Sequence, residues 1–154
     1  MICQNFFCQC GNLIEITITA EPNSTKRLEY ASEMFNGCES LATINLAWLD
    51  LSKVSSVSNM FECCTVLEEL DLSKVNAKAI KYSDCIFEGC SNLAKLNLTG
   101  LKMENLVAGW CMFKNCYNLK EILVTDFPNK LSDEQRNSMF ENCGIACFTL
   151  VTEA

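Results

Sequence analysis

The sequence predicts an α/β solenoid: a right-handed coil of stacked repeats, with one parallel β-sheet on one side and short helices or 3-10 turns on the convex side. Three observations predict this fold class. A five-residue phrase ending in cysteine recurs six times, its copies lie about 26 residues apart, and apolar residues hold fixed places between the copies. Internal repetition of this kind is typical of proteins in which each repeat packs only against its neighbours.

The repeated phrase is clearest in the middle of the chain. It reads MFNGC, MFECC, IFEGC and MFKNC from positions 34, 60, 86 and 112, with FFCQC at 6 and MFENC at 139 as outer copies. Successive copies start 28, 26, 26, 26 and 27 residues apart. Three equal intervals in a row indicate a structural repeat. Because no linker interrupts it, we expect one domain of about six repeats over residues 1–154.

Each phrase leads into the pattern C-x-x-L-x-x-[IL]-x-[LIV], which predicts a strand. In the third copy this pattern places Leu67, Leu70 and Leu72 after Cys64. Alternation of apolar and polar residues at its end indicates a short strand with one buried face. The predicted core columns are Leu13, Leu41, Leu67, Leu93 and Leu119; Ile16, Ile44, Leu70, Leu96 and Ile122; and Ile18, Leu46, Leu72, Leu98 and Val124.

The segment before each repeat cysteine predicts a short helix or turn. Ser132 and Gln135 form a capping-box pattern ahead of MFENC. Residues 23–38 and 104–116 are also compatible with one to three helical turns. Directly before the repeat cysteine, Gly or Asn fills four of six places, because both tolerate the left-handed backbone that ends a helix. Cys63 takes this place in the third copy, so we expect it to be strained and exposed.

The two ends of the chain are less regular. Two more apolar columns follow the strands. The first is Leu49, Val75, Leu101 and Phe127, and the second is Val54, Ile80 and Leu106. The last copy keeps the rhythm only when shifted by one residue, with Ile145, Phe148 and Leu150 pointing inward. Neither end shows the polar cap that solenoids usually need. We therefore expect a fragment of a longer array, or end-to-end self-association.

The complete repeat, M-F-x-[GN]-C-x-x-L-x-x-L-x-L, resembles the BspA-like leucine-rich repeats of bacterial and protist surface proteins. MFECCTVLEELDLSKV and IFEGCSNLAKLNLTGL are its best copies. SKVNAKAIKY and TGLKMENLVAG depart from the Phe-Asp-Thr-Ser-Asn-Val stretch that usually follows in this variant. The resemblance implies a leucine-rich-repeat fold and a binding or adhesion array in a secreted or surface-anchored protein, without catalysis.

Composition excludes several classes of function. The chain contains no histidine, which removes Ser-His and Cys-His nucleophile pairs and imidazole metal ligands. A net charge of −7 leaves no surplus of Lys and Arg to neutralise nucleic-acid phosphates. No apolar run approaches the roughly 18 residues that span a bilayer, and the first residues lack the features of a signal peptide. We therefore expect no enzyme, no cofactor, no nucleic-acid partner and no membrane insertion.

Six of the twelve cysteines occupy the repeat column. We interpret them as small buried side chains, each stacked on the thiol of the next rung. A disulfide needs Cβ atoms about 3.8 Å apart and converging, whereas parallel rungs hold them about 4.8 Å apart and aligned. A linear column does not converge on a metal, and no C-x-x-C pair occurs. The sequence therefore predicts a reduced, metal-free structural ladder of Cys10, Cys38, Cys64, Cys90, Cys116 and Cys143.

The redox state of the other six cysteines stays open, namely Cys3, Cys8, Cys63, Cys85, Cys111 and Cys147. Cys85 and Cys111 share a column one rung apart, so a bridge between them is an open alternative. Redox sensing at Cys63 would lack a histidine to activate the thiol. So many thiols favour a reducing compartment, whereas the family resemblance implies the cell surface. The sequence does not decide between these locations.

Polar residues that alternate with the buried strand positions form the candidate binding face. Its members are Glu15, Thr17, Thr43, Asn45, Glu69, Asp71, Ser73, Lys95, Asn97, Thr99, Glu121 and Thr125. The face is short-chained, mildly acidic and almost free of aromatic anchors, so a solvated sheet face without a partner is the alternative. We expect a protein-interaction or adhesion module whose partner presents a basic surface. An intracellular scaffold or effector of the same fold is the second hypothesis, and a thiol redox protein the third.

Overall fold

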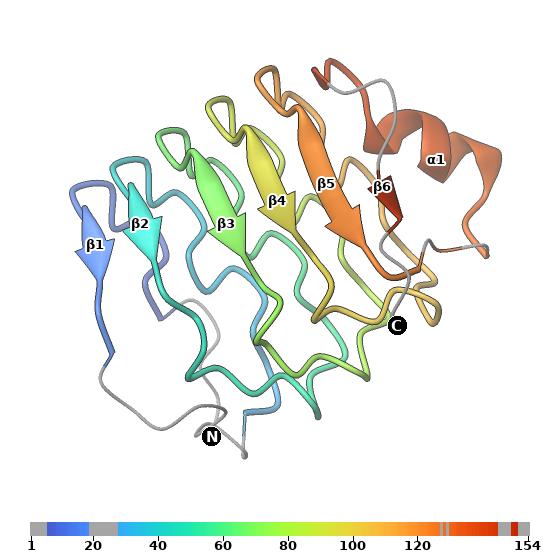
Figure 1. Ribbon diagram of the computed structural model, residues 1–154, viewed down its shortest axis with the longest axis horizontal. Coiled ribbons are helices and arrows are strands. Elements are labelled where there is room, and N and C mark those ends of the chain that lie inside the picture. Colours follow the sequence, from blue (N-terminus) through green and yellow to red (C-terminus); the bar gives the residue numbers. More distant parts are fainter. Residues whose placement is uncertain (1–5, 19–27, 127, 129, 145–148, 151–154) are drawn as a thin grey trace.

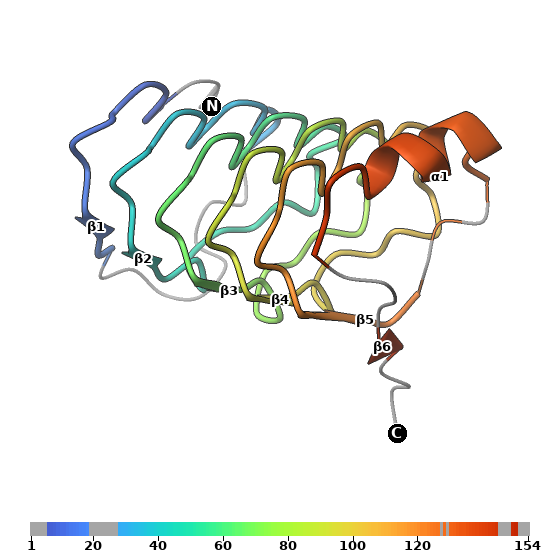
Figure 2. The same cartoon turned by 90° about the horizontal axis from the view of Figure 1, so that it is seen from above.

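The computed structural model describes residues 6–18, 28–126, 128, 130–144 and 149–150. Six short strands follow one another along the chain: β1 (Glu15–Ile16), β2 (Thr43–Ile44), β3 (Glu69–Asp71), β4 (Lys95–Asn97), β5 (Glu121–Val124) and β6 (Thr149–Leu150). One helix, α1 (Asp133–Met139), lies between β5 and β6 in sequence. Figure 1 shows the strands side by side in chain order, and Figure 2 shows the repeats stacked as successive rungs.

Strand register follows the repeat. Glu69 pairs with Lys95 and Lys95 with Glu121, all in parallel orientation, so equivalent residues of successive copies stand in line. At the last rung, Val124 pairs with Leu150, which confirms the one-residue shift predicted for the final copy. Ile145 and Phe148, the other residues named for that copy, lie outside the described residues, as does Phe127. The handedness of the coil stays a prediction.

The prediction of a single sheet is wrong. β1 pairs with β2 in one sheet and β3 to β6 form a second, with no pairing between β2 and β3. Elsewhere on the same two rungs the backbone bonds continue: Phe35 donates to the Met60 carbonyl at 2.9 Å, and Gly37 to that of Glu62 at 2.8 Å. The strands can therefore separate locally, because the rungs are held together along the repeated phrases.

The described segments before the cysteines form a short helix or a turn, as predicted, and the helix belongs to the last copy. Ser132 caps α1 through the predicted capping box with Gln135. The described parts of 23–38 and 104–116 form turns instead. Around MFNGC, every second backbone N–H donates to a carbonyl of the next rung, and Phe35 is an example. The N–H groups between them donate to the carbonyl three residues earlier, as Asn36 donates to Glu33. An α-helix would need every N–H for its own bonds, so cross-rung bonding excludes it.

A left-handed backbone closes these turns, as predicted. The residue before the repeat cysteine has positive φ in every copy: Gln9, Gly37, Cys63, Gly89, Asn115 and Asn142. A second left-handed column, four residues earlier, was not expected from the sequence: Glu33, Asn59, Cys85 and Cys111. The helix α1 has seven residues, and no helix in the described part of the chain is long and apolar enough to span a membrane.

The core is a set of stacked columns, one residue per rung. Its centre is a row of phenylalanine rings with neighbouring centroids 5.1–5.8 Å apart and planes inclined by 7–20°: Phe7, Phe35, Phe61, Phe87, Phe113 and Phe140. The predicted apolar columns are buried in the second to fifth copies, except Ile44, which is partly buried. In the first copy Leu13 is only partly buried and Ile18 is 36% exposed, against expectation. This rung has a described neighbour on one side only, so its side chains lack half of their packing partners.

Candidate functional site

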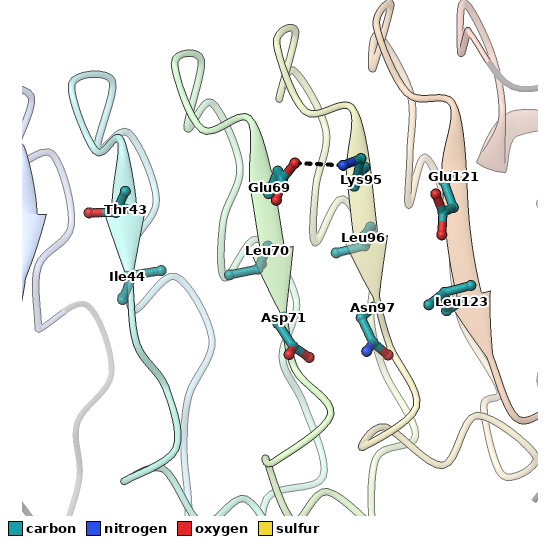
Figure 3. Close-up of a pocket in the computed structure, with 10 residues that line it drawn as sticks. All are labelled: Thr43, Ile44, Glu69, Leu70, Asp71, Lys95, Leu96, Asn97, Glu121 and Leu123. Carbon is teal, nitrogen blue, oxygen red and sulfur yellow. Dashed lines mark ion pairs between the residues drawn. The ribbon is translucent and has the colours of Figure 1, made fainter.

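The predicted binding face lies on the outward side of the strands. Glu15, Thr43, Glu69, Lys95 and Glu121 are all exposed and stand in register across β1 to β5, apart from the break between β2 and β3. Lys95 lies 3.0 Å from a carboxylate oxygen of Glu69 (Figure 3), and this hydrogen-bonded carboxylate raises the pKa of the Lys95 ammonium. Because both side chains are largely in water, the pair contributes little to stability.

Three residues of the predicted face have a structural task as well. Asn45, Asp71 and Asn97 each accept a backbone N–H from two residues ahead, at 3.0, 2.8 and 3.1 Å. These are Asx turns, in which a side-chain oxygen replaces the next backbone acceptor. They lie at the ends of β2, β3 and β4, where the chain leaves the sheet. The sequence signal was present, since Asn or Asp stands at the end of three strand patterns, but we read it only as surface polarity.

A hollow of about 390 Å³ lies over the middle of this surface. It is lined by ten residues from β2 to β5 (Figure 3): Thr43, Ile44, Glu69, Leu70, Asp71, Lys95, Leu96, Asn97, Glu121 and Leu123. Six of the twelve predicted face residues take part. The other six, Glu15, Thr17, Asn45, Ser73, Thr99 and Thr125, do not line it. The prediction therefore covers a wider area than the hollow.

Sequence reasoning missed the apolar part of the hollow. Ile44, Leu70 and Leu96 belong to a predicted core column, yet they also line the hollow. Leu123 is half-buried and occupies the place that Asn45, Asp71 and Asn97 hold in other rungs. The available signal was this change from polar to apolar within one outward column.

A second hollow, of about 420 Å³, lies at the break between the two sheets. Ala42 and Thr43 line it from the β2 side, and Val66, Glu68 and Glu69 from the β3 side. Thr43 and Glu69 line both hollows. The separation of β2 from β3 thus coincides with the second hollow, and the charged residues that line the two hollows are acidic apart from Lys95.

The cysteine ladder is buried in four of its six rungs. Cys38, Cys64, Cys90 and Cys116 are fully buried, whereas Cys10 is exposed and Cys143 partly buried, against expectation. The buried thiols do not simply stack on one another. Each donates to the carbonyl of the phenylalanine one repeat back, at 3.0–3.3 Å: Cys38 to Phe7, Cys64 to Phe35, Cys90 to Phe61 and Cys116 to Phe87.

Burial makes these thiols poor nucleophiles. Desolvation raises the pKa of Cys38 to about 11 and that of Cys116 to about 12, and it raises those of Cys64 and Cys90 as well. A thiol reacts as its thiolate, which this environment disfavours. These four thiols of the ladder are part of the core.

Cys63 and Cys85 do not carry the features of a redox site, and Cys3 and Cys147 lie outside the described residues. Cys63 has the expected left-handed backbone, with φ 59°, but it is partly buried rather than exposed. Burial, followed by the charges of Glu62 and Glu88, raises its pKa. Burial and Glu88 also raise the pKa of Cys85. An activated thiol needs a shift in the opposite direction.

Three side chains from two rungs converge beside the ladder. The sulfur atoms of Cys85 and Cys111 and a carboxylate oxygen of Glu88 all lie within 4.8 Å of one another, and all three residues are partly buried. Both cysteines are free thiols, as are the other eight cysteines that the structure describes. Sequence reasoning recognised the shared column of the two cysteines, but not Glu88, which the turn at 85–88 brings back to them.

Comparison with protein families agrees with this architecture. A family model described as the BspA type leucine rich repeat region, in six copies, matches residues 1–146. The chain belongs to this family. Leucine-rich repeats of this kind generally mediate protein–protein interaction or adhesion. Neither the comparison with curated proteins nor that with solved structures gave a match.

Proposed function

We propose that the chain is a non-catalytic protein-interaction module that binds a polypeptide through the outward surface of β2 to β5. The observation that carries the proposal is the 390 Å³ hollow on this surface. Its volume lies in the range of sites that accept a few side chains of a ligand. The repeats hold its lining residues in fixed register, so the surface is organised before a partner arrives.

The lining favours a partner with basic and apolar side chains. Ile44 and Leu123 contribute partly exposed apolar surface. Glu69, Asp71 and Glu121 oppose the single ammonium of Lys95, so three negative charges and one positive give the lining a net charge of −2. An apolar centre with charge at its edge is the usual anatomy of a protein interface. A segment carrying Lys or Arg next to an apolar residue would complement it.

A charge-reversal experiment tests the surface. Peptides would be selected from a random display library against the full chain, and their dissociation constants measured by fluorescence polarisation. We expect enrichment in Lys and Arg, and at least about 10-fold weaker binding to the triple variant Glu69→Lys, Asp71→Lys, Glu121→Lys, because repulsion replaces attraction at three contacts.

A matched variant controls for net charge. Glu29→Lys, Glu39→Lys, Glu104→Lys makes the same change of charge at exposed residues that line neither hollow. It should bind the selected peptides as tightly as the original chain. If the strand variant also retains full affinity, or if both variants lose it equally, the outward surface of β2 to β5 is not the binding surface.

The same surface would serve an intracellular scaffold or effector, our second candidate. The ten described cysteines are all free thiols, which supports a reducing location. Thiol titration of protein isolated under alkylating conditions separates the two candidates. Twelve reactive thiols after unfolding would support the intracellular candidate, whereas disulfides in the isolated protein would support a surface or secreted location.

A further inference from the structure

We propose that Cys85, Glu88 and Cys111 form a binding site for one thiophilic divalent cation of the zinc class. Their three ligand atoms lie within 4.8 Å of one another. Zinc bonds thiolate at about 2.3 Å, which in a tetrahedron separates sulfur atoms by roughly 3.8 Å. Side-chain rotation alone can therefore close the cluster around an ion.

The backbone places the two sulfur atoms side by side. Cys85 donates its N–H to the carbonyl of Trp110, beside Cys111, at 2.7 Å, which holds the two rungs together at this level. Both cysteines have a left-handed backbone with φ 54°, so their side chains leave the two rungs in the same way. Glu88 donates its N–H to the Cys85 carbonyl at 3.1 Å, and this tight turn returns its side chain to the thiols.

Neighbouring repeats show how the same positions are satisfied without sulfur. Asn59, one rung before Cys85, donates its side-chain amide to the carboxylate of Glu62, the counterpart of Glu88. Glu62 also accepts from the Asn36 amide at 2.7 Å. On the next rungs, Lys114 pairs with Glu141 at 3.0 Å. Glu88 stands between these two pairs and faces two thiols instead.

The ligand set selects the class of ion. Two thiolates with one carboxylate suit zinc, whereas magnesium and calcium require oxygen ligands. The thiols would release their protons to solvent on binding, as metal-bound cysteines do. Partial burial of all three residues leaves a path for entry, and a water molecule would complete the tetrahedron. The bound ion would link the fourth and fifth rungs, so it should also stabilise the fold.

Cobalt(II) provides the decisive measurement. The full-length chain, kept reduced with a phosphine, would be titrated with cobalt while thiolate-to-cobalt absorption is recorded. We expect one ion per chain, displacement by zinc, and a higher melting temperature with zinc. Cys85→Ser and Cys111→Ser should each weaken binding by at least about 100-fold and Glu88→Gln by about 10-fold.

Cys63→Ser is the matched control. Cys63 is also a partly buried thiol with a left-handed backbone in the same part of the molecule, but it is not a member of the cluster. Its variant should bind cobalt as the original chain does. The site is refuted if the reduced chain gives no thiolate-to-cobalt band, if the double variant Cys85→Ser, Cys111→Ser keeps the band, or if the two cysteines form only a disulfide.

Discussion

The two sides of each rung differ in how strictly they repeat. Along the phrases, the phenylalanine rings stack from Phe7 to Phe140 without a gap, and backbone bonds join successive rungs. Along the strands, pairing fails between β2 and β3, where one hollow lies, and a second hollow extends from β2 to β5. The comparison teaches that the stacked phrases maintain the array, which leaves the strand side free to vary. Variation on that side is what a binding surface requires.

Truncating one ring should produce the largest loss. Phe61 is fully buried between two stacked rings, so Phe61→Ala should lower the free energy of unfolding by about 3–5 kcal/mol. Ile44→Ala, on the strand side of the break, should cost only about 1 kcal/mol, because Ile44 is partly exposed already. Urea unfolding followed by circular dichroism measures both. Equal losses would mean that the two sides contribute alike.

A smaller effect is expected within the cysteine ladder. Cys90→Ala removes a buried sulfur and its 3.0 Å bond to the Phe61 carbonyl, which should cost about 1–2 kcal/mol. That carbonyl keeps a second donor, the N–H of Cys64, so no acceptor is stranded. Cys10→Ala, at the exposed end of the same column, should be almost neutral. A large loss at Cys10 would contradict its exposed position.

Features set by nearest neighbours could be predicted from the sequence. The strand register, the capping box at Ser132 and the left-handed position of Cys63 each follow from a residue and its local pattern. The BspA-like family and its repeat could be recognised because Phe, Cys and Leu recur at fixed spacing. The core columns failed at Ile18, whose rung has a described neighbour on one side only, and at Ile44, which lies beside the break between the two sheets.

Features that depend on the fit between rungs could not be predicted. Nothing in Thr43 or Glu69 indicates that their strands do not pair, because the separation depends on the packing of whole repeats. The choice between helix and turn before each cysteine also depends on neighbouring repeats, because the N–H of Phe35 bonds across rungs and is not free for a helix. The cluster at Cys85 and Cys111 was visible only as a shared column, since 26 residues separate its thiols.

Alkaline pH should lower the free energy of unfolding because of the buried thiols of the cysteine ladder. An unfolded thiol titrates near pH 9.0, whereas burial raises the pKa of Cys90 in the fold well above that value. Above pH 9 the unfolded chain therefore loses a proton that the folded chain keeps. The contribution of this thiol to the free energy of unfolding is fully present below pH 9 and is lost as the pH rises. From about pH 9 upward, the original chain should lose about 1.4 kcal/mol more per pH unit than Cys90→Ala. If the urea midpoints of the original chain and of Cys90→Ala change with pH in the same way, this linkage is refuted.

The smallest effect concerns the one cysteine in the left-handed column before the ladder. Cys63 has φ 59°, a conformation that most side chains disfavour but asparagine tolerates. Cys63→Asn should therefore raise the free energy of unfolding by about 0.5 kcal/mol. Two asparagines of this column already fit on adjacent rungs, where Asn142 donates to Asn115 at 3.0 Å.

Gly89→Ala provides the opposite test on the next rung. Gly89 has φ 74°, and an added Cβ would lie 3.2 Å from the Cys63 sulfur, so this variant should lose about 1 kcal/mol. Thermal unfolding of both variants against the original chain gives the sign of each change. If Cys63→Asn destabilises the fold, the thiol at this position has a packing role that outweighs its backbone strain. The side chain at the left-handed position that closes each turn would then contribute to the stability of the stacked phrases.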